Sequence, residues 1–191
     1  IYESIVQDIL AVPVICGKKT DAEKFAGADD TYCIEAMMGD KRALQAGTSH
    51  YLGQNFAKAF DVKFQDIDNS EKYVYATSWG VSTRLIGALI MVHGDDKGLR
   101  LPPNIAPIKV VLVPIYKTED ELQKVKDYLS VTMNYCAENS ITYYFDDREK
   151  LSPGYKFNEW EMKGVPLRIE VGMRDCNNKI LTIARRDQDQ K

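Results

Sequence analysis

The stretch TSWGVSTRLIGALIMVHGD, residues 77–95, joins two different patterns at one glycine. Before Gly80 the aromatic and small residues are typical of the end of a strand, whereas residues 85–92 are apolar on nearly every side. An unbroken apolar segment of this kind predicts a buried helix. We therefore expect a strand that turns at Gly80 and leads into this helix, with Ser82 or Thr83 capping the first turn.

Arg84 lies in that first turn, where backbone N–H groups and the helix dipole favour an anion. A guanidinium fork at the same place favours phosphate in particular. A second interpretation is that Arg84 caps a sheet edge or pairs with a carboxylate. The spacing alone leaves both interpretations open.

Upstream of this stretch, the pattern predicts antiparallel strands with short helices. An amphipathic helix is expected within residues 1–13, and Gly39 with Asp40 predicts a tight turn between two strands. The expected strands are 31–38, 43–50, 62–65 and 73–79, with a further helix over 52–60. Antiparallel strands that carry helices on one side form an α+β unit.

Downstream of Gly94 the sequence is charged and turn-rich, and three prolines interrupt it: Pro102, Pro103 and Pro107. This composition predicts a linker and a domain boundary. Beyond it, the apolar run 109–116 predicts a buried parallel strand. Thr118 and Glu121 predict a capping box that opens a helix to about residue 138. The remaining elements expected are strands over 141–146, 167–172 and 180–185 and a helix over 157–163. This alternation predicts a mostly parallel sheet covered on both faces.

Composition limits the classes of protein that remain. The 191 residues can bury two modest cores, and no apolar run is long enough to cross a membrane. The net charge of −3 argues against a protein that coats nucleic acid over its whole surface, although it allows a local basic site. The four cysteines have no C-x-x-C spacing, so we expect reduced thiols in a cytoplasmic protein, with neither a zinc site nor disulfides.

Three segments resemble the prolyl-tRNA synthetases, in particular the type found in eukaryotes, archaea and some bacteria. They are GTSHYLGQNF at 47–56, the stretch at 77–95, and SPGYKFNEWEMKGVPLRIEVG at 152–172. The resemblance implies that residues 1–100 are the C-terminal part of a class II catalytic domain, including its third signature motif. It also implies that residues 108–191 are an anticodon-binding domain. The expected fold is α/β overall, with an antiparallel α+β portion followed by a mixed, mostly parallel α/β domain.

The resemblance also implies roles for residues of the first domain. It assigns ATP contacts to Gln45, Thr48 and Arg84, and proline contacts to Phe25, His50, Trp79, Gly80 and Ser82. A rigid, apolar proline ring suits an aromatic wall with a few polar groups that orient it. Without the resemblance, Phe25 and Trp79 are equally well interpreted as core aromatics, and His50 as a structural histidine.

In the second domain, the resemblance implies that Phe157, Glu161, Arg168 and Arg174 contact the anticodon guanines. Aromatic rings interleaved with charged side chains are what recognition of unstacked RNA bases requires. The alternative is an ion-pair network at the end of a solvated sheet. No G-x-G-x-x-G or P-loop spacing occurs in this domain, so no nucleotide cofactor is predicted there.

The activity implied is ATP-dependent formation of prolyl-adenylate, followed by transfer of the prolyl group to tRNA(Pro). No side chain need act as a nucleophile or base, and Mg²⁺ is expected as part of the ATP complex. The full-length protein is expected to be a homodimer. The family's first and second motifs are expected upstream of Ile1, so this chain alone should be inactive or nearly so. The alternative is a non-catalytic tRNA-binding or regulatory relative that kept the fold.

Overall fold

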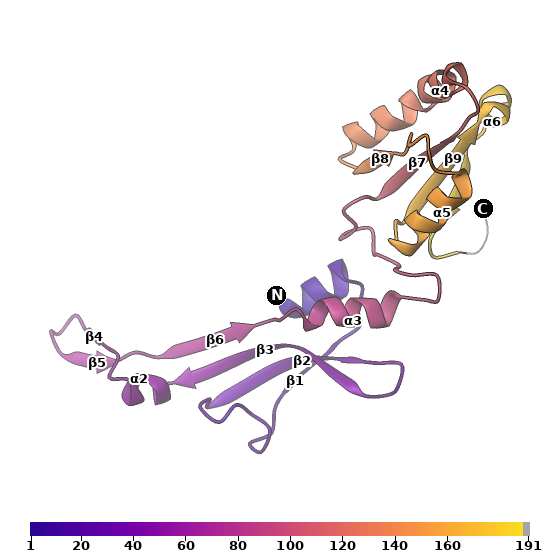
Figure 1. Ribbon diagram of the computed structural model, residues 1–191. Coiled ribbons are helices and arrows are strands. Elements are labelled where there is room, and N and C mark those ends of the chain that lie inside the picture. The colour runs from indigo at the N-terminus through magenta and orange to yellow at the C-terminus, as the bar shows by residue number, and fades with distance from the viewer. Residues whose placement is uncertain (189–191) are drawn as a thin grey trace. The chain divides into compact units, whose positions relative to one another are not determined.

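The chain forms two compact units, Ile1–Val92 and His93–Lys191 (Figure 1). The structure is a computed structural model that describes residues 1–188, so the last three residues of the predicted 108–191 domain lie outside the described part. No helix among residues 1–188 is both long and apolar enough to cross a bilayer. The domain limits expected from the sequence, 1–100 and 108–191, stay predictions.

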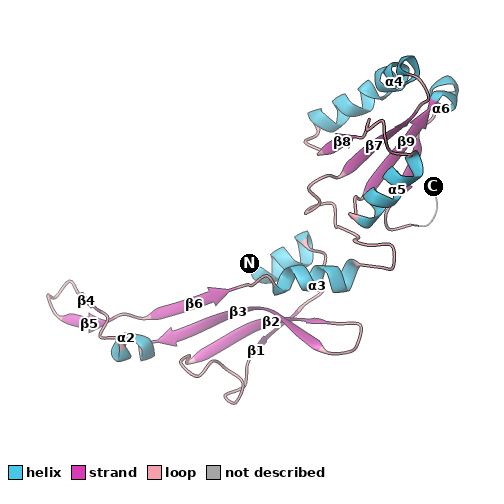
Figure 2. Ribbon diagram, in the orientation of Figure 1, coloured by secondary structure: helices cyan, strands magenta, loops and turns pink. Residues whose placement is uncertain are grey.

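The first unit is built on a four-stranded antiparallel sheet with the order β1-β2-β3-β6 (Figure 2). Its strands are β1 (Ile15–Lys18), β2 (Asp30–Met37), β3 (Ala43–Gly53) and β6 (Ala76–Gly80). The turn predicted at Gly39 and Asp40 joins β2 to β3. Between β3 and β6 lie the short helix α2 (Asn55–Ala59) and a separate hairpin of β4 (Lys63–Gln65) and β5 (Glu71–Tyr73). The single strand predicted over 73–79 is therefore wrong, because residue 73 pairs in this hairpin and residues 76–80 pair with β3.

Helices cover one face of this sheet. The chain begins with α1 (Tyr2–Ser4) and a π-helical turn η1 (Ile5–Ile9), and α3 (Arg84–His93) follows β6. Val6 and Val12 pack with Ile34 of β2 in a small apolar cluster, against which Leu85 and Val92 of α3 also pack. This packing positions the first turn of α3 directly after the end of β6.

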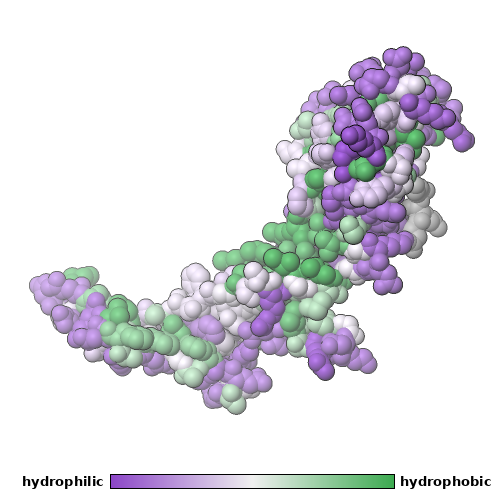
Figure 3. Space-filling model, viewed as in Figure 1, coloured by the Kyte–Doolittle hydropathy of each residue, from purple (hydrophilic) through white to green (hydrophobic). Residues whose placement is uncertain are grey.

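The prediction that α3 is buried is wrong. Only Ala88 of this helix is buried, whereas Ile86 is 60% exposed, Ile90 46% and Met91 59%. One side of the helix rests on the cluster of the first unit, and its other apolar side faces outward. Figure 3 shows the resulting hydrophobic surface over this segment.

The second unit is a four-stranded mixed sheet with the order β10-β9-β7-β8. Its strands are β7 (Val110–Ile115), β8 (Tyr143–Phe145), β9 (Leu167–Gly172) and β10 (Thr182–Arg185). Strand β7 pairs in parallel with both β8 and β9, and β10 is an antiparallel edge. The predicted mixed, mostly parallel sheet is confirmed, as is the α/β class overall.

Helices cover both faces of this second sheet. On one face α4 (Glu119–Glu138) and α6 (Met173–Asn178) pack against the strands, with Leu112 and Leu129 fully buried. On the other face α5 (Pro153–Met162) buries Trp160 against Val111 and Val113. The apolar run of β7 is buried because alternate residues face the two helical layers.

Side-chain caps fix where the helices of the second unit begin. Thr118 Oγ1 accepts a hydrogen bond from Glu121 N, and the Glu121 carboxylate accepts one from Lys117 N. Helix α5 begins four residues earlier than predicted because Ser152 caps it and Pro153 occupies its first position. Helix α6 was not predicted, since six residues are too few to show a period.

Candidate functional site

Five of the eight residues predicted to bind ATP or proline lie around one pocket of the first unit. The pocket has a volume of about 260 Å³ and forms where β3, the end of β6 and the start of α3 meet. Its lining comprises Gln45, Ala46, Gly47, Thr48, Gly80, Val81, Ser82 and Arg84. Two segments that are 32 residues apart in the sequence, Gln45–Thr48 and Gly80–Arg84, thus meet at the end of a strand and the first turn of a helix.

Backbone geometry places each group in this pocket. Thr48 of β3 pairs directly with Gly80 of β6, so the two face the same side of the sheet. The Ser82 hydroxyl accepts a hydrogen bond from Arg84 N at 3.3 Å. The Arg84 guanidinium reaches across to donate to the Gln45 carbonyl at 3.3 Å. A cation and the N-terminal turn of α3 therefore meet at one place, an arrangement that favours an anionic ligand.

His50 and Phe25 form an aromatic wall on the same face of the sheet. Thr31 Oγ1 lies 2.9 Å from His50 Nδ1, and Thr31 is only 1% exposed. The Phe25 ring lies 5.4 Å from the imidazole and stacks on Phe56 at 6.0 Å. His50 is two residues from Thr48, so its side chain points to the same side as the 260 Å³ pocket. A buried hydroxyl thus fixes the orientation of the ring beside this pocket.

Lys19 is a residue at this site that the sequence prediction missed. Its ammonium group donates to Gln45 Oε1 at 2.6 Å, which fixes the orientation of that amide. Lys19 follows β1, and it meets Gln45 only because β1, β2 and β3 are neighbours in the sheet. No local signal near Lys19 could have indicated this contact.

Burial and the adjacent Glu35 carboxylate raise the pKa of the nearby Cys33 thiol, so this cysteine stays protonated at neutral pH.

Trp79 is not brought together with the other predicted proline contacts. It pairs with Ser49, and alternation along a strand turns its side chain to the opposite face from Gly80. There it is 69% exposed and lines a second, largely apolar pocket of about 570 Å³ with Tyr2 and Tyr32, which shares Gly47 and Thr48 with the first pocket. The expectation that Trp79 and Gly80 form one floor does not fit this register.

In the second unit, three of the four predicted anticodon contacts lie together. The Arg168 guanidinium lies 4.7 Å from the centre of the Phe157 ring and donates to the Phe157 carbonyl at 3.3 Å. It also donates to Glu170 at 2.9 Å. Glu161 lies one turn further along α5 and pairs loosely with Lys97 at 3.8 Å. The cluster thus contains the stacked cation and ring expected for RNA recognition. It also contains ion pairs, as the alternative interpretation expects.

Arg174 lies elsewhere on the unit. Arg168 is near the start of β9, whereas Arg174 is exposed on α6 beyond the end of that strand. The strand alone separates the two positions by roughly 13 Å. Arg174 is therefore not part of the cluster that Phe157 and Arg168 form.

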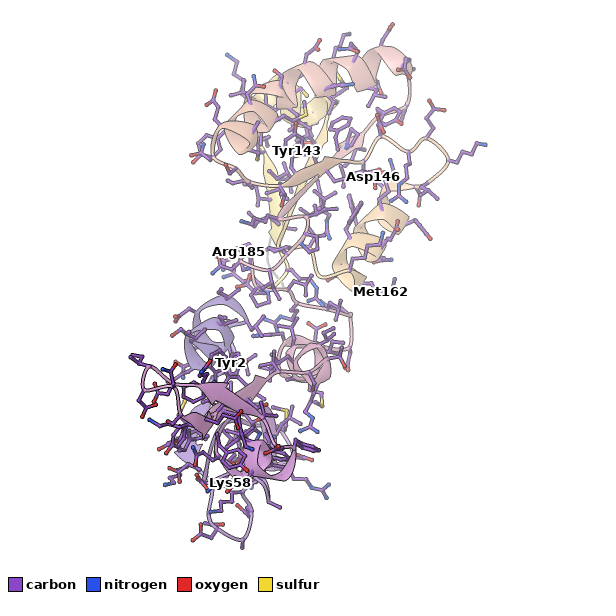
Figure 4. All side chains as sticks on the ribbon, turned by 90° about the vertical axis from the view of Figure 1, so that its left-hand side faces the viewer. Tyr2, Lys58, Tyr143, Asp146, Met162 and Arg185 are labelled. Atoms are coloured by element: carbon purple, nitrogen blue, oxygen red, sulfur yellow. The ribbon has the colours of Figure 1, made fainter. Side chains whose placement is uncertain are left out.

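A buried polar network beside α5 was also missed. Asp146 follows β8 and is 0% exposed (Figure 4). Its carboxylate accepts hydrogen bonds from Arg148 at 2.8 Å and from Trp160 Nε1 at 2.7 Å, and its carbonyl accepts one from the buried Lys156. Burial by itself raises the pKa of Asp146, but Arg148, Trp160 and Lys156 outweigh it and hold the pKa at about 2. Lys156 and Trp160 thus tie α5 to the residue that follows β8, and Trp160 packs in the same apolar cluster as Phe157.

Within residues 1–188 no group of three or more His, Cys, Asp or Glu side chains is arranged to hold a metal ion.

Residues 109–191 match the family described as the anticodon binding domain. The chain is 55% identical over 187 residues to a proline–tRNA ligase of Flavobacterium psychrophilum, covering 98% of this chain and 38% of that protein. It is 56% identical over 191 residues to a proline–tRNA ligase of Chloroflexus aggregans, covering 100% of this chain and 40% of that protein.

Solved structures give the same relationship. The prolyl-tRNA synthetase of Cryptosporidium parvum complexed with L-proline and AMP matches with a TM-score of 0.87 and 44% identity over 98% of this chain. The same enzyme complexed with halofuginone and AMPPNP matches with a TM-score of 0.88 over 100% of this chain. These matches cover 40% and 39% of the solved chains. The chain therefore belongs to the prolyl-tRNA synthetase family, and it spans about 40% of the length of the relatives it matches.

Proposed function

We propose that the chain is part of a proline–tRNA ligase, in which the first unit takes part in activating proline with ATP and the second unit binds the anticodon of tRNA(Pro). The observation that carries this proposal is the pocket in which Arg84, the first turn of α3 and the Gln45–Thr48 part of β3 meet. Binding of L-proline and AMP by the related Cryptosporidium enzyme supports it.

In this proposal each group of the first unit has a definite task. Arg84 and the N–H groups of the first turn of α3 bind phosphate oxygens of ATP, and Thr48 and Gln45 fix the nucleotide. Lys19 orients Gln45. Mg²⁺ arrives with the triphosphate. Proline lies against the aromatic wall of Phe25 and His50, with Ser82 and Gly80 nearby.

Catalysis then depends on placing two anions in line rather than on a side-chain nucleophile. The proline carboxylate attacks the α-phosphate of ATP, the bond from that phosphate to pyrophosphate breaks, and prolyl-adenylate results. Positive charge held beside the phosphates stabilises the charge that develops during this step. Trp79 has no place in this step, since its side chain faces the opposite side of the sheet.

In the second unit Phe157 and Arg168 offer a flat surface on which a base stacks, and the Glu161 carboxylate accepts hydrogen bonds from base edges. Arg174 contacts a different nucleotide, because it lies beyond the far end of β9. The assignment of residues 1–100 to a catalytic domain and of 108–191 to an anticodon-binding domain belongs to this proposal. So do a homodimeric full-length enzyme and a cytoplasmic location.

The decisive experiment measures proline-dependent exchange of pyrophosphate into ATP by a full-length protein that contains this chain. We expect exchange by the wild type and a loss of at least about 100-fold in the Arg84→Ala variant, since one well-placed charge-stabilising donor contributes on that scale. The matched control is Arg42→Ala. Arg42 pairs loosely with Asp40 in the turn between β2 and β3 and does not line the pocket.

Three outcomes separate the candidate functions. Exchange that depends on Arg84 and not on Arg42 supports the ligase. No exchange by the full-length protein, together with retained binding of tRNA(Pro), supports the non-catalytic relative instead. Equal losses in both variants mean that the pocket around Arg84 has no special role.

A further inference from the structure

Thr31 is a buried residue whose hydroxyl contacts the histidine of the proposed proline site. It lies on β2, directly opposite His50 of β3 in the register of the sheet. Thr31 is only 1% exposed, and its Oγ1 lies 2.9 Å from His50 Nδ1. Within residues 1–188 this ring nitrogen is the only hydrogen-bond partner of the hydroxyl. The hydroxyl therefore depends on a single contact.

The direction of this hydrogen bond follows from the burial of the hydroxyl. A threonine hydroxyl has one proton to donate, and a neutral imidazole has one nitrogen that donates and one that accepts. If Nδ1 of His50 carried the proton, the Thr31 O–H would be buried without an acceptor. A buried donor that is left unpaired is disfavoured by roughly 5- to 150-fold. The hydroxyl therefore donates to Nδ1, and the imidazole proton lies on Nε2.

Neighbouring groups hold both partners of this hydrogen bond in place. The Phe25 ring lies 5.4 Å from the imidazole at an angle of 55°, and Phe56 stacks on Phe25. On the other strand, Lys19 N donates to the Thr31 carbonyl at 2.8 Å. The imidazole thus has one orientation, and its Nε2 makes no hydrogen bond to any group within residues 1–188.

An Nε2–H group discriminates between the two ends of proline. The carboxylate only accepts hydrogen bonds, whereas the ring ammonium only donates them, so Nε2–H pairs with the carboxylate alone. His50 lies two residues from Thr48 on β3, which is roughly 7 Å along the strand. Thr48 lines the pocket that contains Arg84. A carboxylate bound at His50 therefore lies on the side of the site where the phosphates of ATP are proposed to bind.

We propose that Thr31 is a positioning residue that holds His50 in the Nε2–H tautomer, and that this tautomer directs the carboxylate of proline toward ATP. The inference rests on the proposed function and adds a residue that contacts neither substrate. Without the Thr31 hydroxyl, the imidazole also adopts the Nδ1–H form, in which Nε2 is an acceptor. An acceptor cannot pair with a carboxylate, so a charge-assisted hydrogen bond to proline is lost in that form.

The first test measures the tautomer by nitrogen-15 magnetic resonance of the imidazoles in the 191-residue chain. Spectra are taken at about pH 8.5, where an unperturbed imidazole is neutral. The chain has two histidines, so the His50→Ala variant assigns the signals. In the wild type we expect His50 to carry its proton on Nε2. Thr31→Val should shift the Nδ1 resonance and add the Nδ1–H form, whereas Thr31→Ser should keep the wild-type pattern.

The second test measures proline-dependent exchange of pyrophosphate into ATP by a full-length protein that contains this chain. Thr31→Val should raise the KM for proline several-fold and leave the KM for ATP unchanged, and Thr31→Ser should keep both. In a His50→Ala background Thr31→Val should have no further effect, because it acts through the imidazole. Thr77→Val is the matched control, since it removes an exposed hydroxyl from the opposite face of the same sheet.

A substrate analogue tests which end of proline faces His50. L-Prolinol keeps the ring and the ammonium group but has a neutral hydroxymethyl group in place of the carboxylate. As a competitive inhibitor of exchange, it should lose less affinity than proline does in Thr31→Val, because a hydrogen bond to a neutral group is weaker than one to a carboxylate. Equal losses for the two compounds would overturn the proposed orientation.

The remaining outcomes separate this inference from the proposed function. An Nδ1–H form as the main species in the wild type, or an unchanged spectrum in Thr31→Val, overturns the inference even if the protein is active. A KM for proline that rises equally with and without the His50 side chain, or equally in Thr77→Val, also overturns the inference alone. If the full-length wild type shows no exchange, the proposed function fails and the orientation of proline fails with it. Circular dichroism of each variant checks that the fold is intact.

Discussion

The two units differ in how completely each sheet is covered. In the second unit helices cover both faces, and Leu112, Val125 and Leu129 are fully buried. In the first unit helices cover one face, and Ile15 remains 74% exposed and Ile86 60% exposed. A sheet covered on both faces buries its side chains and so contributes mainly to stability. An open sheet face leaves its polar groups accessible to a ligand. Substitutions of buried residues in the second unit should therefore affect mainly stability, and substitutions on the open face of the first unit should affect mainly binding.

The polar residues show the same contrast. Asp146 and Lys156 of the second unit are buried and satisfied by each other and by Trp160. Arg84 and Gln45 of the first unit line an open pocket instead. A buried charge is costly to leave without its partner, whereas an exposed one is hydrated. Three predictions test this contrast.

The largest effect is expected from Asp146→Ala. The substitution leaves the buried Lys156 charge and the Trp160 N–H without their carboxylate, so the free energy of unfolding should fall by about 3–5 kcal/mol. Asp147→Ala is the control, since this neighbour is exposed and accepts its hydrogen bond from Tyr116 through the backbone carbonyl, which the substitution keeps, and it should change stability by less than about 0.5 kcal/mol. Urea unfolding followed by Trp160 fluorescence in a Trp79→Phe background measures both. Equal effects would show that the network is not buried in solution.

A smaller difference in the free energy of unfolding is expected between truncations of two side chains of equal size, Leu129 in the core and Ile86 on the surface. Leu129→Ala should lower the free energy of unfolding by about 2–5 kcal/mol, because it leaves a cavity between α4 and the sheet. Ile86→Ala should change it by less than about 0.5 kcal/mol, because that side chain already faces outward. Urea unfolding followed by far-ultraviolet circular dichroism measures both. A loss above 2 kcal/mol for Ile86→Ala would mean that the outer side of α3 is covered in this chain.

The smallest effect is expected from acid. The pKa of Asp146 is about 2 in the folded unit and about 3.9 in an unfolded chain. A depressed pKa contributes stability that is fully present above about pH 4 and is lost as the pH falls toward 2. At about 1.4 kcal/mol per pH unit, the contribution is roughly 2–3 kcal/mol.

Asp146→Asn removes this titration. Its free energy of unfolding, measured by Trp160 fluorescence at pH 5 and at pH 2.5, should therefore fall less than that of the wild type. Parallel losses in the two proteins would mean that other carboxylates account for the acid sensitivity of the second unit.

Much of the fold follows from local patterns. The run 109–116, the Thr118 cap and the turn at Gly39 each identified an element correctly, because strand periodicity, caps and tight turns depend on neighbouring residues. The predictions for α3 and for residues 73–79 failed where the answer depends on what packs beside the segment. An apolar helix is buried only on the sides that other elements cover, and a strand joins whichever sheet offers it a partner.

The candidate site divides in the same way. The family resemblance singled out Gln45, Thr48, Gly80, Ser82 and Arg84 from the sequence, and all five line one pocket. The role of each residue stays a prediction. The contacts of Lys19, Thr31 and Asp146 were not foreseeable, since each meets its partner through sheet order or helix packing. Pairing register alone turned Trp79 to the opposite face.

The sequence by itself determined the alternation of most elements, the capped start of α4 and the stretches that resemble the prolyl-tRNA synthetases, because propensity, capping and motif spacing act over a few positions. Only the tertiary structure decided which faces are open, which charges are buried, and that Leu99 and Leu101 of the predicted linker hydrogen-bond to the backbone at the end of α5. The physical reason is that burial and pairing depend on segments brought together from distant parts of the chain, and no local pattern contains that information.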